Sequence, residues 1–177
     1  MGLLATEAGV DSFISLAGAG NPIDQIILEQ ITKTAPFFTE DTKRVLEILK
    51  SGKTTTEFPP ALASIFSLDI QPFMSNWMQY NPQKRIESLE IPVLIINGTR
   101  DLQVSTTEAQ LLKDHKTDAE IVIIENMNHL LFEINGDDLV NTKSYNELSY
   151  PIMPEVITAI LEADFLKEDL QDYFGTE

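Results

Sequence analysis

The sequence predicts an α/β fold of about three parallel strands with flanking helices, and two segments carry most of that prediction. Ile91 to Asp101 reads IPVLIINGTRD, and Glu120 to His129 reads EIVIIENMNH. Each begins with an apolar, β-branched run, which is typical of a strand buried on both faces of a parallel sheet. A shorter run, Phe13 to Leu16, precedes the glycine-rich turn AGAG and is predicted to be a further strand.

Each of the two longer runs ends in polar residues and is followed by a residue type used in catalysis. Asp101 follows the first run and His129 the second. The carboxyl ends of parallel strands share one edge of the sheet, where ligands bind in open α/β folds. The sequence therefore predicts that Asp101 and His129 lie side by side, like the acid and base of a hydrolytic triad. The alternatives are a turn-forming Asp101 and a loop histidine bonded only to backbone.

The segments PVLIINGTRDLQV and IVIIENMNHLLFEI together resemble the last two core strands of the α/β-hydrolase family, closest to bacterial serine esterases and serine peptidase-like enzymes. In that family the triad runs nucleophile, acid, histidine along the chain. The resemblance implies ester or amide hydrolysis with Asp101 as acid and His129 as base. It also implies a small-molecule ester or peptide substrate for the complete enzyme, and no cofactor.

The family's nucleophile elbow, GxSxG, does not occur in this sequence. Ser12 and Ser15 flank the start of the first predicted strand rather than a strand-to-helix turn, and Ser105 follows Asp101 too closely to be an independent partner. No nucleophile is therefore assigned. In the family, one N–H donor of the oxyanion hole belongs to the residue after the nucleophile. Without the elbow, the sequence therefore lacks that donor as well. We expect the chain to be inactive alone.

The resemblance also implies an organisation of the chain in which Met1 falls inside the helix that follows the nucleophile. Residues 1–20 are then the end of that helix and the first visible strand, residues 21–80 a helical cap insertion, and residues 81–177 the carboxy-terminal α/β core. On this expectation the chain is truncated, and the upstream strands are missing. The alternative is that residues 1–9 form an ordinary amino-terminal helix.

Periodic apolar residues between the first two strands predict a series of helices. They are expected at Pro22–Thr34, Thr39–Lys50, Ala61–Phe66 and Pro72–Tyr80. In the family a cap over the active site is inserted here. The candidates for lining an acyl pocket are Phe73, Met74, Trp77 and Met78, and the alternative for each is packing within the protein core.

The remaining elements complete a parallel crossover and a terminal helix. A helix at Thr107–Lys113 returns the chain between the second and third strands. The segment Asn135–Tyr150 is long and polar and is assigned no element. An amphipathic helix is predicted at Pro154–Leu166. The side chains expected to face inward from it are Val156, Ile157, Ile160 and Leu161.

Composition narrows the class of partner. The chain has 12 Lys and Arg against 28 Asp and Glu, a formal charge of −16. This acidity argues against nucleic-acid and anionic-membrane partners, because phosphate binding requires a basic surface. The sequence has no Cys and two His, so no metal site is predicted. No signal peptide or membrane span is visible: a cytoplasmic protein is expected if Met1 is the natural start, and an exported one if a signal lies upstream.

An unpaired first strand leads to an expectation about assembly. The missing neighbour of Phe13–Leu16 would leave its N–H and C=O groups open to another chain. We therefore expect self-association, or pairing with a separately encoded amino-terminal half. Two alternatives to the hydrolase interpretation stay open: a non-enzymatic remnant that binds a ligand or partner, and a fragment with no independent role.

Overall fold

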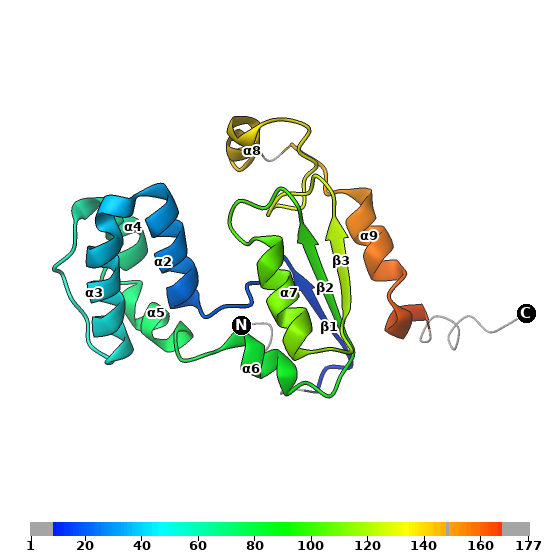
Figure 1. The fold of residues 1–177 in the computed structure, drawn as a ribbon, viewed down its shortest axis with the longest axis horizontal. Helices are drawn as coiled ribbons and strands as arrows, with labels where there is room; N and C mark the ends of the chain where they lie inside the picture. Colours follow the sequence, from blue (N-terminus) through cyan, green and yellow to red (C-terminus); the bar gives the residue numbers. More distant parts are fainter. Residues whose placement is uncertain (1–8, 148, 168–177) are drawn as a thin grey trace, which may run out of the picture. The chain divides into compact units, whose positions relative to one another are not determined.

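The computed structural model describes residues 9–147 and 149–167 (Figure 1). The chain divides into an α/β unit, residues 1–20 and 83–177, and a helical unit, residues 21–82. Each unit has a hydrophobic core of its own. Across the described ranges, no helix is long and apolar enough to span a membrane. The helix expected at the amino terminus, before the first strand, falls on residues 1–8, which lie outside the described residues.

The α/β unit is built on a three-stranded parallel sheet in the order β1-β2-β3. The strands are β1 (Phe13–Leu16), β2 (Val93–Gly98) and β3 (Glu120–Ile124). Phe13 lies opposite Val93, and Leu94 lies opposite Glu120. The predicted α/β class, with about three parallel strands and flanking helices, is confirmed.

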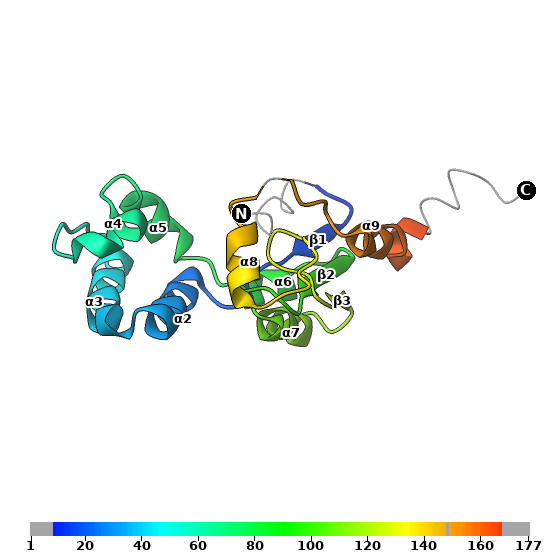
Figure 2. The ribbon, with the colours of Figure 1, turned by 90° about the horizontal axis from the view of Figure 1, so that it is seen from above.

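Strand β2 is buried along its whole length because its side chains alternate between two cores. Leu94 and Ile96 enter a core that contains Met153 and Val156 of the carboxy-terminal region. Val93 and Ile95 enter a second core on the opposite face, together with Leu112. Figure 2 shows the two covering helices, α7 and α9, on opposite sides of the sheet.

The helices of the α/β unit include two that the sequence interpretation did not assign. They are α6 (Pro82–Glu87), α7 (Thr106–His115), α8 (Asp138–Ser144) and α9 (Pro154–Leu161). The crossover helix α7 was predicted, whereas α6 and α8 were not. Helix α8 begins at a good cap, since Oδ1 of Asp137 accepts the N–H groups of Leu139 and Val140 at 3.1 and 3.0 Å.

Helix α9 is shorter than predicted, and the inward-facing assignment along it was partly wrong. Val156 is buried at 2% exposure and belongs to the core, as expected. Ile157 and Leu161 are 51% and 57% exposed. A short helix packed against a twisted sheet buries only a narrow stripe, so neighbouring apolar positions face away from the sheet.

The helical unit consists of α-helices and 3₁₀ turns around one apolar core. The elements are α2 (Ile23–Thr34), η2 (Pro36–Phe38), α3 (Thr39–Lys50), η3 (Pro60–Leu62), α4 (Ala63–Phe66) and α5 (Gln71–Trp77). Its buried core residues are Ile27, Val45, Leu46, Leu49, Leu62, Phe66 and Met74.

A buried glutamine anchors the irregular part of the helical unit. Gln71 has no exposed surface, yet its side chain is fully bonded. Its amide donates to the carbonyls of Thr55 and Phe66 at 2.7 and 2.6 Å, and its oxygen accepts the N–H of Thr55 at 2.9 Å. The N–H and C=O groups of Thr55, in the loop before η3, therefore have their hydrogen bonds within the helical unit.

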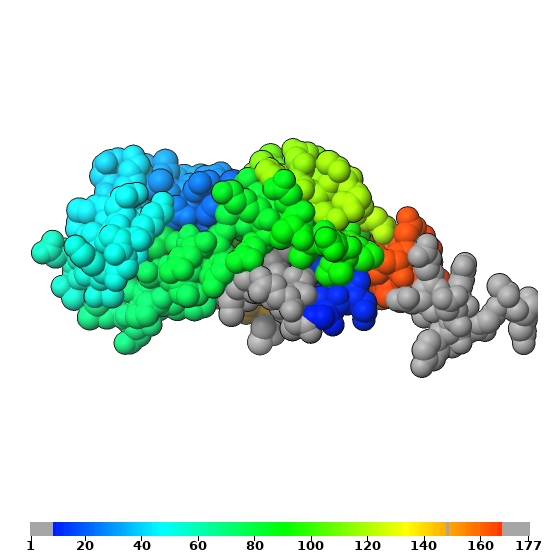
Figure 3. Space-filling view, turned by 90° about the horizontal axis from the view of Figure 1, so that it is seen from below, coloured from blue at the N-terminus to red at the C-terminus, as the bar shows by residue number. Residues whose placement is uncertain are grey.

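Strand β1 lies at one edge of the sheet, and the central strand β2 ends in a glycine. Among the described residues, β1 pairs only with β2, and atoms of the chain around β1 reach the surface of the α/β unit (dark blue in Figure 3). Gly98, the last residue of β2, allows a close approach: a Cβ there would lie 2.0 Å from the carbonyl oxygen of Met127.

Candidate active site

Asp101 stands in a tight turn directly after β2. Its N–H donates to the carbonyl of Gly98 at 3.3 Å. Oδ1 accepts the N–H groups of Gln103 and Val104 at 2.7 and 2.8 Å. Asp101 therefore does form a turn, which was the alternative to a catalytic role. The turn uses only one of the two carboxylate oxygens. Oδ2 is left to face the neighbouring loop.

His129 is presented by a loop that its preceding residue, Asn128, holds in place. Asn128 is completely buried. Its Oδ1 accepts the N–H groups of Leu130 and Phe132, both at 3.0 Å, and its own N–H donates to the carbonyl of Phe132. This internal bonding lets Leu131 adopt a left-handed conformation with φ of 65°. The loop is thus an ordered turn after β3.

The structure brings the two predicted residues together. Oδ2 of Asp101 lies 2.9 Å from Nδ1 of His129. The Asp101 side chain is completely buried, whereas the His129 side chain keeps 28% of its surface exposed. A carboxylate in this position fixes the imidazole and requires the proton of the neutral ring to be on Nδ1. Nε2 then becomes the basic nitrogen.

A buried polar network joins both loops to α8. The amide of Asn141 donates to the carbonyl of Arg100 at 2.6 Å. The amide of Asn128 donates to Oδ1 of Asn141 at 3.3 Å and to Oγ of Ser144 at 2.9 Å. Ser144 in turn donates to the carbonyl of Asn141 at 2.7 Å. Helix α8 therefore holds the residue before Asp101 and the residue before His129.

Arg100, the residue before Asp101, also points toward the start of α8. Its guanidinium donates to the carbonyl of Gly136 and lies 3.7 Å from the carboxylate of Asp138. Asp138 is largely exposed, so this ion pair adds little stability. Its main effect is to orient the segment that leads into the helix.

Tyr145, just after α8, has a buried hydroxyl near the same pair. The hydroxyl makes no hydrogen bond among the described residues. Burial raises its pKa above the ordinary tyrosine value, and the negative charge of Asp101 raises it further. The nearby backbone groups of Leu102 and His129 and the side chain of Gln103 act in the opposite direction and lower the pKa by a smaller amount.

The serines considered as nucleophiles lie elsewhere in the structure. Ser15 is buried in β1, and Ser105 precedes α7, where its hydroxyl pairs with that of Thr107 at 2.6 Å. Ser12 lies just before β1. Within the described ranges, none of these side chains bonds to His129, and no hydrogen bond is formed at Nε2 of that ring. In the part of the chain that the structure describes, the imidazole of His129 is therefore bonded to Asp101 and to none of these serines.

The four candidate pocket residues all lie on or next to α5 in the helical unit. Met74 is buried in the core of that unit, and Met78 packs against the same core. Phe73 and Trp77 are 51% and 37% exposed, and their rings are 5.4 Å apart. Only the two aromatic side chains therefore present a substantial surface outside the unit's core.

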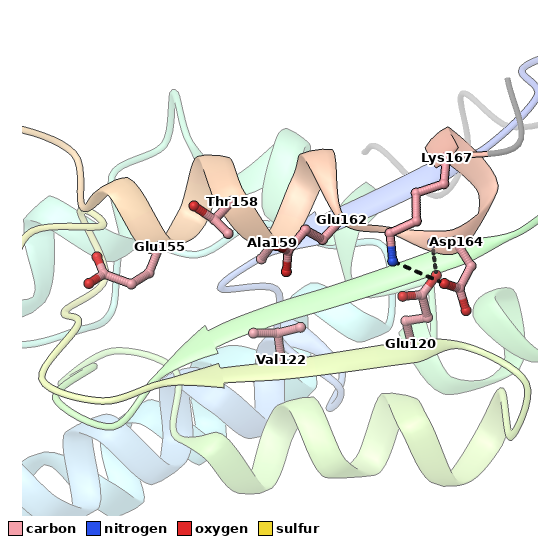
Figure 4. Close-up of a pocket in the computed structure, with 8 residues that line it drawn as sticks. All are labelled: Glu120, Val122, Glu155, Thr158, Ala159, Glu162, Asp164 and Lys167. Atoms are coloured by element: carbon pink, nitrogen blue, oxygen red, sulfur yellow. Dashed lines mark hydrogen bonds and ion pairs between the residues drawn. The ribbon is translucent and has the colours of Figure 1, made fainter. Parts of the chain in front are cut away.

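An open acidic groove lies between β3 and α9 in the α/β unit (Figure 4). It has a volume of about 380 Å³ and is lined by Glu120, Val122, Glu155, Thr158, Ala159, Glu162, Asp164 and Lys167. Glu120 accepts the N–H of Asp164 at 2.9 Å, and Lys167 lies 3.4 Å from the Asp164 carboxylate. Neither Asp101 nor His129 lines the groove. Within the described residues, no cluster of three or more His, Asp or Glu could hold a metal ion.

No protein-family model matches the sequence, and no curated protein matches it. Among solved structures, the chain is similar to α/β-hydrolases. One is Est816, described as an N-acyl homoserine lactone degrading enzyme: 14% identity, 82% of this chain and 60% of that chain covered, TM-score 0.39. Another is a lipase-esterase related protein from Clostridium acetobutylicum. It has 14% identity and a TM-score of 0.42, with 81% of this chain and 58% of that chain covered. A third is MGS-M2, an α/β-hydrolase from a deep-sea metagenome. It has 16% identity and a TM-score of 0.42, with 99% of this chain and 60% of that chain covered.

The chain spans 58–60% of the length of these three structures. Identities and TM-scores are low throughout.

Proposed function

We propose that this chain carries the acid and base of a Ser-Asp-His triad of the α/β-hydrolase type, for ester or amide hydrolysis through an acyl-enzyme. Asp101 is the acid and His129 the base. The observation that carries the proposal is the 2.9 Å contact between a completely buried carboxylate and Nδ1 of a partly exposed imidazole. Each of the two side chains comes from the loop that follows a strand of the parallel sheet.

The arrangement suits the chemistry of a general base. Two backbone N–H groups hold Oδ1 of Asp101, so the carboxylate cannot turn away from the ring. The charge of the carboxylate stabilises the imidazolium that forms when Nε2 takes a proton. During acylation that proton comes from a serine hydroxyl, and it passes to the leaving group as the substrate bond breaks.

The nucleophile belongs, in this proposal, to polypeptide other than the segments described. A GxSxG turn would also supply one of the oxyanion-hole N–H groups. Both are needed, because removal of an oxyanion-hole donor alone lowers kcat by about 10²–10³. The isolated chain is therefore a hydrolase part that is inactive alone.

The proposal is tested by adding back a nucleophile. The purified chain is assayed on p-nitrophenyl acetate and butyrate, alone and with the product of any adjacent reading frame that encodes GxSxG. We expect no turnover above background alone, and turnover in the mixture. His129→Ala should abolish that turnover, whereas His115→Ala, which removes the only other histidine, should not.

Two results would contradict this proposal. One is turnover by the chain alone that requires His129, because the nucleophile would then lie within these 177 residues. The other is turnover in the mixture that survives His129→Ala, because the base would then be supplied by the other polypeptide.

A second candidate function is ligand binding without catalysis, and the exposed aromatic pair on α5 favours it. Phe73 and Trp77 form a tilted pair on the helical unit. Trp77 is the only tryptophan of the chain, so its fluorescence reports on this surface directly. A saturable change on titration with decanoate, lost in Phe73→Ala, would support acyl-chain binding. An unchanged spectrum would exclude decanoate and acyl chains like it as ligands of this surface.

A further inference from the structure

Helix α8 contains one side chain that connects the two loops of the candidate site. The carboxamide of Asn141 uses its nitrogen for the carbonyl of Arg100 and its oxygen for the amide of Asn128. Arg100 directly precedes Asp101, and Asn128 directly precedes His129. Asn141 therefore bridges the backbone next to the carboxylate and the side chain next to the imidazole.

This bridge is rigid because its members are buried and bonded to one another. Asn128 and Asn141 have no exposed surface, and Ser144 has 1%. Ser144 accepts the second N–H of the Asn128 amide and closes the network onto the carbonyl of Asn141. A buried and well-satisfied polar network of this kind specifies one arrangement of the groups around it.

We infer that Asn141 is a positioning residue for the Asp101–His129 pair, an inference that rests on the proposed function. By fixing the carbonyl of Arg100 and the side chain of Asn128, Asn141 sets the direction from which the carboxylate and the imidazole approach. It does not contact the reacting atoms. Its effect is to keep Nδ1 of His129 facing Oδ2 of Asp101, and therefore to keep Nε2 free as the basic nitrogen.

A second connection between the loops makes the prediction specific. The N–H of Arg100 also donates to the carbonyl of Met127 at 2.9 Å, so the bases of the loops stay joined without Asn141. Loss of Asn141 should therefore leave the sheet and the loop bases in place. The change should be confined to the orientation of the His129 ring relative to Asp101.

The tautomer of His129 measures that orientation directly. In the complete chain labelled with ¹⁵N-histidine, at an alkaline pH where imidazoles are neutral, the ring nitrogen shifts distinguish Nδ1–H from Nε2–H. We expect the wild-type His129 ring in the Nδ1–H form. Asn141→Ala should convert this signal to a mixture of the two tautomers. Asn141→Ser, whose hydroxyl cannot span both partners, should do the same and serves if the alanine variant fails to fold.

Two controls separate positioning from a general loss of stability. Leu112→Ala removes a buried side chain from the core between the sheet and α7, which does not include Asn141. This variant should keep the Nδ1–H signal of His129. His115 is bonded through Nδ1 to the carbonyl of Leu111, so its signal should stay constant in all variants. A His115→Gln variant assigns the two signals.

The outcomes distinguish this inference from the proposed function. A His129 ring held as Nδ1–H in wild type and in both Asn141 variants would overturn the positioning role and leave the Asp101–His129 pair intact. A wild-type His129 ring without the Nδ1–H preference would overturn both. Loss of the preference in Leu112→Ala as well would show that overall stability, and not Asn141, governs the ring.

Discussion

The carboxylate of Asp101 is completely buried, yet the His129 ring bonded to it at 2.9 Å keeps 28% of its surface exposed. One edge of the imidazole thus meets a fixed acceptor, and the ring is not sealed inside the protein. Because its other oxygen accepts two backbone N–H groups, Asp101 is a structural residue as well as a candidate catalytic one.

Asp101→Ala should destabilise the α/β unit more than His129→Ala does. The alanine at position 101 leaves two backbone N–H groups and the imidazole without their acceptor, an expected loss of about 2–4 kcal/mol. His129→Ala removes one bond from a carboxylate that keeps two others, an expected loss of about 1 kcal/mol. Urea unfolding followed by circular dichroism measures the difference. An equal loss of unfolding free energy in the two variants would show that the turn at Asp101 does not depend on the carboxylate.

Trp77 supplies an internal control for that experiment. It lies in the helical unit, so its fluorescence follows the unfolding of that unit. Both substitutions should shift the transition seen by circular dichroism and leave the fluorescence midpoint unchanged. A common shift in both signals would mean that the two units unfold together.

Tyr145→Phe should be neutral or stabilising at pH 7, in contrast to most substitutions of buried polar residues. The hydroxyl is buried without a hydrogen-bond partner, so its removal relieves a desolvation cost of about 1–3 kcal/mol and leaves no partner unsatisfied. Thermal unfolding measures this. A clear loss of stability would show that the hydroxyl is bonded in solution.

The same substitution should alter the response to alkaline pH. The pKa of Tyr145 is raised in the folded protein, so above the unfolded tyrosine value of about 10 the unfolded chain loses the proton first. The unfolded state then binds fewer protons, and stability falls as pH rises through this range. Tyr145→Phe should lose less stability between about pH 9 and pH 11 than wild type. Parallel curves would contradict the raised pKa.

Gly98→Ala should destabilise the α/β unit by about 2–3 kcal/mol or more, because the new methyl group would meet a backbone carbonyl that cannot rotate away. The matched control is Gly136→Ala, where the nearest atoms belong to the Val140 side chain at 2.8–3.0 Å. Val140 is 42% exposed and has room to move. A similar loss of stability in the two variants would show that the loop around Met127 can move to accommodate the methyl group.

Association through β1 is predicted because, among the described residues, this strand is paired on one side only. Phe13 and Ala17 direct their N–H groups to β2, so by alternation Ile14 and Leu16 direct theirs to the side on which no described strand lies. Leu16 is 44% exposed. We expect sedimentation at micromolar concentrations to show dimers or larger species, and Leu16→Lys to weaken them.

The control for this prediction is Leu139→Lys. Leu139, on α8, is 61% exposed and should accept a charge without any effect on association. A protein that stays strictly monomeric would count against pairing through β1. Equal weakening by both substitutions would point to general surface hydrophobicity.

The strands and the two candidate residues were predictable because the signals for them are local. An apolar run that ends in polar residues marks the end of β2 and of β3, and parallel topology brings those ends to one edge. That reasoning predicts that Asp101 and His129 lie side by side, and in the structure their side chains are 2.9 Å apart. Their catalytic roles stay a proposal.

The network behind the pair was not predicted, because its members resemble surface residues in the sequence. Asn128, Asn141 and Ser144 are polar side chains in a polar segment, and burial of such residues depends on tertiary contacts. One local signal was available. Gly136-Asp137-Asp138 is a typical helix start, with an N-cap aspartate and an acidic first turn, and it marks α8.

The independent core of the helical unit has a consequence for the order of folding events. Strand β1 pairs with β2 only after the chain closes a loop that contains the whole helical unit, whereas β2 and β3 are joined by one short crossover. If the helical unit folds first, far fewer flexible residues remain in that loop. Each halving of a flexible loop lowers the closure cost by about 0.6 kcal/mol, so the gain amounts to a several-fold faster docking of β1. Gln71→Ala, which removes hydrogen bonds within the helical unit, should therefore slow refolding of the sheet in the α/β unit.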